Sequence, residues 1–151
     1  MSKYAKDTKV PVDRSMSEIR RTLARYEAAA FALIEKSNQA GVAFEMCNRR
    51  VRFVIPMPDM QDYRRNTAGV AMGDVKSQQA YDKEVRRRWR ALLLVIKAKL
   101  EAVESGVESF EEAFMAQLVL PDGQTMTEWA KPQIEQAYLS GKMPPLLGSG
   151  S

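Results

Sequence analysis

Arginine side chains form the pattern in this sequence that could do chemistry. They gather in three stretches: around Asn48, after Tyr63, and on both sides of Trp89. The guanidinium group suits phosphate recognition because its planar fork of N–H donors matches two phosphate oxygens. We therefore expect a nucleic-acid interface that contacts the backbone, formed by Arg49, Arg50, Arg52, Arg64, Arg65, Arg86, Arg87 and Arg90.

The side chains of most acid–base and metal chemistry are absent or scarce. The sequence holds no histidine and a single cysteine, Cys47, so it lacks Ser-His-Asp and Cys-His pairings and the ligands of a zinc site. Its eight glycines are scattered and form no phosphate-binding loop. We expect no cofactor, and the pattern favours a protein without enzymatic activity.

One catalytic alternative stays open. Glu45, Asp59 and Asp62 could gather around Mg²⁺, as in a metal-dependent nuclease, because carboxylate oxygens bind this ion. The structural interpretation pairs Glu45 with Arg52 across two strands and leaves the aspartates in a turn-like segment. Cys47 is interpreted as a partly exposed and inert residue, since the sequence offers it no base partner.

Charge divides the chain into a basic and an acidic part. Residues 1–100 hold 21 Lys/Arg against 11 Asp/Glu, a net charge of +10, whereas residues 101–151 hold 2 against 8, a net charge of −6. A polyanionic partner would explain the basic part. Packing of acidic helices beside basic ones would explain the division equally well, so both explanations stay open.

A long helix predicted over residues 81–105 must position several of the arginines. Its apolar residues recur at spacings of three and four, which is typical of one buried helix face. This face consists of Val85, Trp89, Leu92, Ile96, Leu100 and Val103. Because Trp89 lies on it, we expect this side chain in the core rather than stacked on a base.

A β-hairpin predicted over residues 41–56 presents three more arginines. A two-residue turn at Asn48 and Arg49 would bring every apolar residue of one face opposite another, whereas a slip of one residue would destroy the pattern. In this register the opposed pairs are Val42 and Ile55, Phe44 and Phe53, Met46 and Val51, and Glu45 and Arg52.

The segment before the hairpin is predicted to be an arm and a helix. Residues 1–14 show no periodicity and are expected to be mobile. A capping box at Ser15 then opens a helix that runs to about Asn38, and Gly41 fits its end. The buried stripe of this helix is expected to be Ile19, Leu23, Tyr26, Ala30 and Leu33.

The segments around the long helix complete the chain. Residues 56–76 are interpreted as a flexible loop. Capping boxes at Ser109 and Thr125 open two shorter helices, the second of which ends at Gly141. The apolar residues 143–147 are expected to pack back on the body, and residues 148–151 have the composition of an added linker.

These elements predict an α+β fold in a single domain over residues 15–147. It consists of a small antiparallel β-hairpin sheet packed on a long central helix and an N-terminal helix, with two shorter C-terminal helices. A lone hairpin is marginal in water, so its apolar face must lie on the helices. The hairpin edge could also pair across a homodimer.

The composition further predicts a cytoplasmic protein. No apolar run approaches the roughly 20 residues that span a bilayer, and the first ten residues contain no apolar core of a signal peptide. The single cysteine permits no intramolecular disulfide. We expect no membrane contact.

Two stretches resemble small proteins encoded by tailed phages and prophages, generally without an assigned function. They are VPVDRSMSEIRRTLARY and RRRWRALLLVIKAKLEAVESGVESFEEAFMAQLVLPDGQTMTEW, and the resemblance covers about residues 10–147. It departs from that pattern after Tyr26, where Glu27 stands instead of a glycine. The resemblance implies a bacterial host cell and a short accessory gene product, either a replication or recombination helper or an antagonist of a host protein.

Three functions are therefore compared. The first is a non-enzymatic accessory protein that binds nucleic acid through a basic surface of the hairpin, loop and central helix. The alternative is a protein-binding modulator or inhibitor of a host or anti-phage defence protein, acting through the hairpin edge or the loop. The third is the Mg²⁺-dependent nuclease of Glu45, Asp59 and Asp62.

Overall fold

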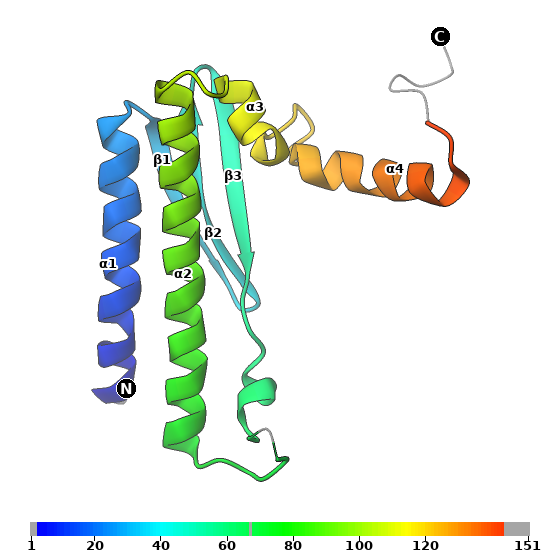
Figure 1. Ribbon diagram of the computed structural model, residues 1–151. Helices are drawn as coiled ribbons and strands as arrows, with labels where there is room; N and C mark the ends of the chain where they lie inside the picture. The colour runs from blue at the N-terminus through cyan, green and yellow to red at the C-terminus, as the bar shows by residue number, and fades with distance from the viewer. Residues whose placement is uncertain (1–2, 67, 144–151) are drawn as a thin grey trace.

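The computed structural model describes residues 3–66 and 68–143 and has the predicted α+β fold (Figure 1). In chain order the elements are α1 (Lys3–Arg25), β1 (Ala29–Lys36), β2 (Gln39–Met46), β3 (Arg49–Pro56), the 3-10 helix η1 (Met60–Tyr63), α2 (Asp74–Glu104), α3 (Phe110–Phe114), the 3-10 helix η2 (Met115–Gln117) and α4 (Met126–Ser140). The strands form one antiparallel sheet in the order β1-β2-β3.

Two helices cover one face of this sheet. Figure 1 shows α1 and α2 side by side and running in the same direction, with the sheet beside them. The core lies between the layers and is closed at one end by α3. Its fully buried side chains are Ile19, Leu23, Val42, Phe44, Val51, Trp89, Ile96, Leu100 and Phe114. The expectation that Trp89 belongs to the core is confirmed.

The first helix differs from its predicted bounds at both ends. It includes Lys3 and passes through Ser15, so no capping box opens it there, and it ends at Arg25 instead of Asn38. Glu27 takes φ 64°, its N–H donates to the Ala24 carbonyl at 3.0 Å, and the Ala28 N–H donates to the Leu23 carbonyl at 2.9 Å. These paired bonds around a left-handed residue are the Schellman motif that ends helices.

Residues 29–36, predicted to be helical, form the edge strand β1, which adds to the two strands of the predicted hairpin. The segment is rich in alanine, which favours helix, but pairing with β2 overrides this local preference. A β-bulge between Ala29 and Ala32 leaves Ala30 with φ 52°. Of the predicted helix stripe, Ile19 and Leu23 are buried, whereas Ala30 and Leu33 are exposed.

We expect Glu27→Gly to stabilise the protein by about 1 kcal/mol, because glycine adopts the left-handed conformation without the steric cost that a side chain adds. Urea unfolding of both proteins, followed by circular dichroism, measures the difference. Glu35→Gly serves as the control, since glycine at this position of β1, which pairs with Ala40, should destabilise the sheet. A loss of stability in Glu27→Gly would contradict this account of the helix end.

The hairpin is confirmed, but its register differs by two residues from the predicted one. The turn residues are Cys47 and Asn48, with φ of 52° and 60°, instead of Asn48 and Arg49. Two positive φ angles are typical of a type I′ turn, which matches the twist of the flanking strands. The observed pairs are Ala40 and Ile55, Val42 and Phe53, Phe44 and Val51, and Glu45 and Arg50. A shift of two leaves each side chain on its predicted face.

The prediction that Gly41 ends a helix is wrong. Gly41 lies buried in the central strand β2, between Ile34 of β1 and Val54 of β3. A Cβ atom at this position would overlap the carbonyl group of Phe53. We expect Gly41→Ala to cost about 2 kcal/mol, because the strands must shift to admit the methyl group. Thermal unfolding tests this, with Gly73→Ala as the control, since a Cβ there would meet nothing within 4 Å.

The long helix begins earlier than predicted. It starts at Asp74 instead of Tyr81, and part of the expected loop is ordered, because η1 and a bridge between Arg65 and Ala71 lie within it. The Asn66 side chain accepts hydrogen bonds from the N–H groups of Ala68 and Val70 at 2.9 and 3.0 Å. These local bonds explain how a segment with no periodicity holds a shape.

The C-terminal predictions are confirmed as far as the described chain extends. Ser109 and Thr125 cap α3 and α4 with complete capping boxes, and Gly141 ends α4 with φ 70°. Pro132 lies within α4 without interrupting it. Residues 144–147, expected to pack back on the body, and the linker at 148–151 lie outside the described residues.

Candidate functional site

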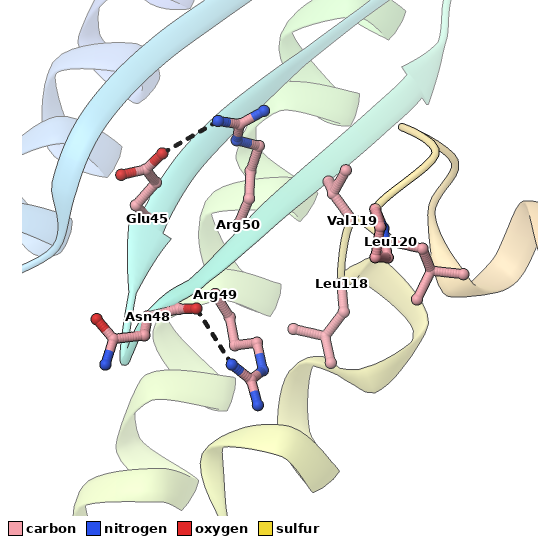
Figure 2. Close-up of a pocket in the computed structure, with 8 residues that line it drawn as sticks. Glu45, Asn48, Arg49, Arg50, Leu118, Val119 and Leu120 are labelled. Atoms are coloured by element: carbon pink, nitrogen blue, oxygen red, sulfur yellow. Dashed lines mark hydrogen bonds and ion pairs between the residues drawn. The ribbon is translucent and has the colours of Figure 1, made fainter.

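The hairpin tip carries Arg49 and Arg50 beside an open hollow of about 630 Å³ (Figure 2). The opposite wall is the chain after η2, where Leu118, Val119 and Leu120 contribute apolar surface. This chain is fixed to the strand because the Val119 N–H donates to the Arg50 carbonyl at 2.8 Å. The tip therefore combines two exposed guanidinium groups with an apolar wall.

Each arginine of the hairpin already has an acidic partner. Arg49 pairs with Glu111 at 3.2 Å and Arg50 with Glu45 at 3.3 Å. The third, Arg52, pairs with Glu128 at 3.5 Å and also donates to the Gly123 carbonyl at 2.9 Å. Two of these acids belong to the acidic C-terminal part, so docking within the molecule accounts for this portion of the charge division.

The loop arginines lie at the other end of β3. Arg64 follows η1 and is exposed, with no hydrogen bond or ion pair from its side chain to the described residues, while Arg65 donates to the Gly69 carbonyl at 3.0 Å. Tyr63 and Tyr81 meet edge to face with ring centroids 6.0 Å apart and join η1 to α2. The structure thus separates the hairpin arginines from the loop arginines by the length of the strand.

A row of basic side chains follows one face of α2. Lys83, Arg86, Arg90 and Lys97 are spaced by three, four and seven residues, which places them on the same side of a helix. This side is turned toward α1, because Lys97 pairs with Glu18 of that helix. Of the four, Lys83, Arg86 and Arg90 make no hydrogen bond or ion pair with the described residues. We call these four residues the α2 basic row.

Arg87 lies on another side of α2, toward the end of β3, and pairs with Glu84. The Arg87 Nε donates to Glu84 at 2.8 Å and the Arg88 Nε donates to the same carboxylate at 2.9 Å. These hydrogen bonds lower the pKa of Glu84 to about 2. Arg88 also donates to the Pro56 carbonyl and so joins α2 to the end of β3. Both arginines serve the fold.

The ion pairs of Glu84 with Arg87 and Arg88, which we call the Glu84 clamp, should make the free energy of unfolding depend on pH. The folded-state pKa of about 2 lies below the ordinary value of 4.5, so the clamp stabilises the protein above pH 4.5 and is lost as the pH falls toward 2. We expect Glu84→Gln to cost about 1 kcal/mol at neutral pH and to flatten this acid dependence. Urea unfolding between pH 7 and pH 3 measures both, with exposed Glu35→Gln as the control. Parallel pH profiles of Glu84→Gln and the natural protein would contradict the assignment.

The three carboxylates of the nuclease hypothesis do not come together. Glu45 pairs with Arg50 near the start of β3, whereas Asp59 and Asp62 follow the end of that strand. Asp59 accepts a hydrogen bond from the Gln61 N–H at 2.9 Å and caps η1. Among residues 13–66 and 68–143, whose side chains the structure describes, no group of three His, Cys, Asp or Glu side chains could hold a metal ion. Cys47 is exposed in the turn.

The α4 helix presents an apolar stripe that the rest of the described molecule does not cover. Figure 1 shows α4 extending away from the sheet and the other helices. None of its residues is buried, and an open hollow of about 650 Å³ runs along Trp129, Ile134 and Tyr138. Its charged residues Glu128, Lys131 and Glu135 lie on the opposite face by helical spacing.

Sequence reasoning missed Lys97 as a member of the basic row and missed the bare stripe of α4. A helical projection would have found the row, because its spacing is regular, but only the α1–α2 packing shows which side it faces. The isolation of α4 had no local signal, since amphipathic helices usually pack on their own domain. The described part of the chain includes no helix with the length and hydropathy needed to cross a membrane.

The fold and the site define an α+β protein with a basic helix row, a charge-paired hairpin tip and a projecting amphipathic helix. A scan against protein-family models, a search of curated proteins and a search of solved structures each gave no match for this chain.

Proposed function

We propose that this protein is a small accessory protein that binds nucleic acid along the backbone, without enzymatic activity, in the cytoplasm of a phage-infected or prophage-carrying bacterium. The observation that carries the proposal is the α2 basic row, in which the side chains of Lys83, Arg86 and Arg90 make no hydrogen bond or ion pair with the described residues, although the charge of Arg90 acts on nearby Glu18. Cations in a row are suited to successive phosphates. The phage resemblance of the sequence agrees with such an accessory role.

Acidic partners at the hairpin tip reduce the set of arginines that are available to bind phosphate. At the tip, Arg49, Arg50 and Arg52 are balanced by three glutamates. A phosphate would have to displace those acids, although exposed pairs of this kind are worth at most about 1 kcal/mol each. We therefore assign the main contacts to Arg64, Arg65, Lys83, Arg86 and Arg90, and a secondary role to the tip.

Fluorescence anisotropy with labelled single-stranded and double-stranded oligonucleotides, repeated across salt concentrations, tests the proposal. If these five cations each neutralise one phosphate of a single strand, the plot of log Kobs against log salt should have a slope of about −3.5. Sequence should matter little, because backbone contacts carry no base information. Absence of binding to both forms at low salt, or binding that salt does not weaken, would refute the function.

A second candidate function is protein binding, and the bare apolar stripe of α4 favours it. Exposed contiguous apolar surface on a helix is typical of an interaction site for another protein. Its partner would be a host protein with an apolar groove, or a second copy of this chain. A pull-down from bacterial lysate treated with nuclease separates this candidate from the first, and Ile134→Ser with Tyr138→Ser should abolish capture. A capture that both substitutions leave unchanged would remove α4 from consideration.

A further inference from the structure

A hollow of about 350 Å³ lies between α1 and α2, on the side where the α2 basic row faces α1. Its volume is at the lower end of ligand pockets, which span about 300 to 1,000 Å³. Its walls come from both helices and consist of Arg14, Ser15, Glu18, Arg90, Leu93, Leu94 and Lys97. The hollow is thus a cleft along the seam of two parallel helices.

The polar groups of this cleft are suited to an anion. Arg14 and Ser15 contribute a guanidinium and a hydroxyl group from α1, while Arg90 and Lys97 contribute two cations from α2. Buried Leu93 forms part of the wall and keeps water from one side. Three cations therefore face one acid, Glu18, which leaves a positive surplus at the seam.

Glu18 is itself adapted to this basic surrounding. Its hydrogen bond from Lys97 lowers its pKa, and the charges of Arg21 and Arg90 act in the same direction against the effect of desolvation. The acid is therefore ionised at neutral pH and holds the Lys97 ammonium group. The Glu18 carboxylate would compete with an incoming anion, because both would bind the same cations.

We propose that this cleft binds one phosphate group of a nucleic-acid backbone, through Arg14, Ser15, Arg90 and Lys97. The inference rests on the proposed function, which it extends from the surface of α2 to the seam with α1. Arg90 and Lys97 belong to both sets, so a strand bound along the α2 basic row passes directly over the cleft. Ser15, expected from the sequence to cap a helix, would donate a hydrogen bond from its hydroxyl group to a phosphate oxygen.

The central experiment compares the natural protein with Arg14→Gln combined with Lys97→Gln, in the anisotropy assay with a single-stranded oligonucleotide. We expect about tenfold weaker binding at physiological salt and a salt slope reduced by about 0.7, since the variant loses cations that neutralise one phosphate of the single strand. The matched control is Lys131→Gln combined with Lys142→Gln on and after α4, which removes the same charge away from the seam. It should bind within about twofold of the natural protein.

A third variant separates a binding role from a structural one. Glu18→Gln removes the competing acid and should strengthen binding several-fold, although it also breaks the Glu18–Lys97 ion pair. A merely structural seam would give weaker or unchanged binding instead. Circular dichroism of each variant at the assay temperature establishes that the proteins are folded.

The outcomes distinguish the cleft from the function as a whole. If the natural protein binds and Arg14→Gln with Lys97→Gln behaves like the control, the cleft is refuted while the proposed function stands. If the natural protein binds no oligonucleotide, the proposed function fails, and thermal shift with inorganic pyrophosphate decides the cleft. A rise in Tm that the double variant loses would then support a site for free phosphates, and no rise would refute the cleft as well.

Discussion

Phe114→Ala should destabilise the protein by about 3–5 kcal/mol, the range expected when a fully buried aromatic side chain is removed. The Phe114 ring is fully buried and meets the rings of Phe44 and Phe53 edge to face, with centroids 5.9 and 6.1 Å away. It also contacts Phe110, at 4.9 Å. Removing it leaves a cavity where α3 closes the core and breaks three aromatic contacts together.

Urea unfolding followed by circular dichroism measures this loss. Met115→Ala is the matched control, because that neighbouring side chain is 45% exposed and its removal should cost less than about 1 kcal/mol. If both substitutions cost the same, α3 is not the closure of the core. A second expectation follows for α4, which is joined to the body through this region: Phe114→Ala should also loosen the chain from η2 onward.

Reversal of two charges in the α2 basic row should weaken nucleic-acid binding by about 100-fold at physiological salt. The variant combines Arg86→Glu with Arg90→Glu, and neither arginine makes an ion pair with the described residues, so folding should be little affected. The loss combines two missing phosphate contacts with two new repulsions. Anisotropy across salt concentrations measures it, with thermal unfolding as the check on the fold.

The hairpin tip provides the sharpest control for this expectation. Arg49→Glu combined with Arg50→Glu changes the net charge by the same amount, but those arginines are already balanced by Glu111 and Glu45. We expect the tip variant to lose no more than about fivefold. A larger loss at the tip than in the row would move the interface to the hairpin.

Local patterns in the sequence predicted the elements whose signals are short-range. The alternation around the turn gave the hairpin, and the capping boxes at Ser109 and Thr125 gave two helix starts, because each depends on residues a few positions apart. The predicted first helix extends beyond the observed end at Arg25 because the left-handed residue that ends it is Glu27, whereas glycine usually marks such a position. The predicted hairpin turn lies one residue too far along the chain because its first residue is Cys47, which takes a positive φ at a position where glycine or asparagine is usual.

The sequence predicts which arginines could bind an anion, but it does not predict how the fold groups them or which acids they pair with. Arginine composition indicated an anion partner, yet the pairs Arg49–Glu111 and Arg52–Glu128 join residues more than 60 positions apart. Such pairs depend on how α3 and α4 dock, which no local pattern determines. The cleft at Arg14 and Lys97 likewise exists only because α1 packs parallel to α2.

The two tryptophans of the chain occupy opposite environments, and this makes them separate spectroscopic reporters. Trp89 is 2% exposed within the core, whereas Trp129 is half-buried on the projecting α4. A soluble quencher such as iodide contacts only Trp129 and quenches its fluorescence. Unfolding of the core changes the fluorescence of Trp89. Single Trp→Phe variants would therefore let occupancy of α4 and integrity of the core be followed independently in one cuvette.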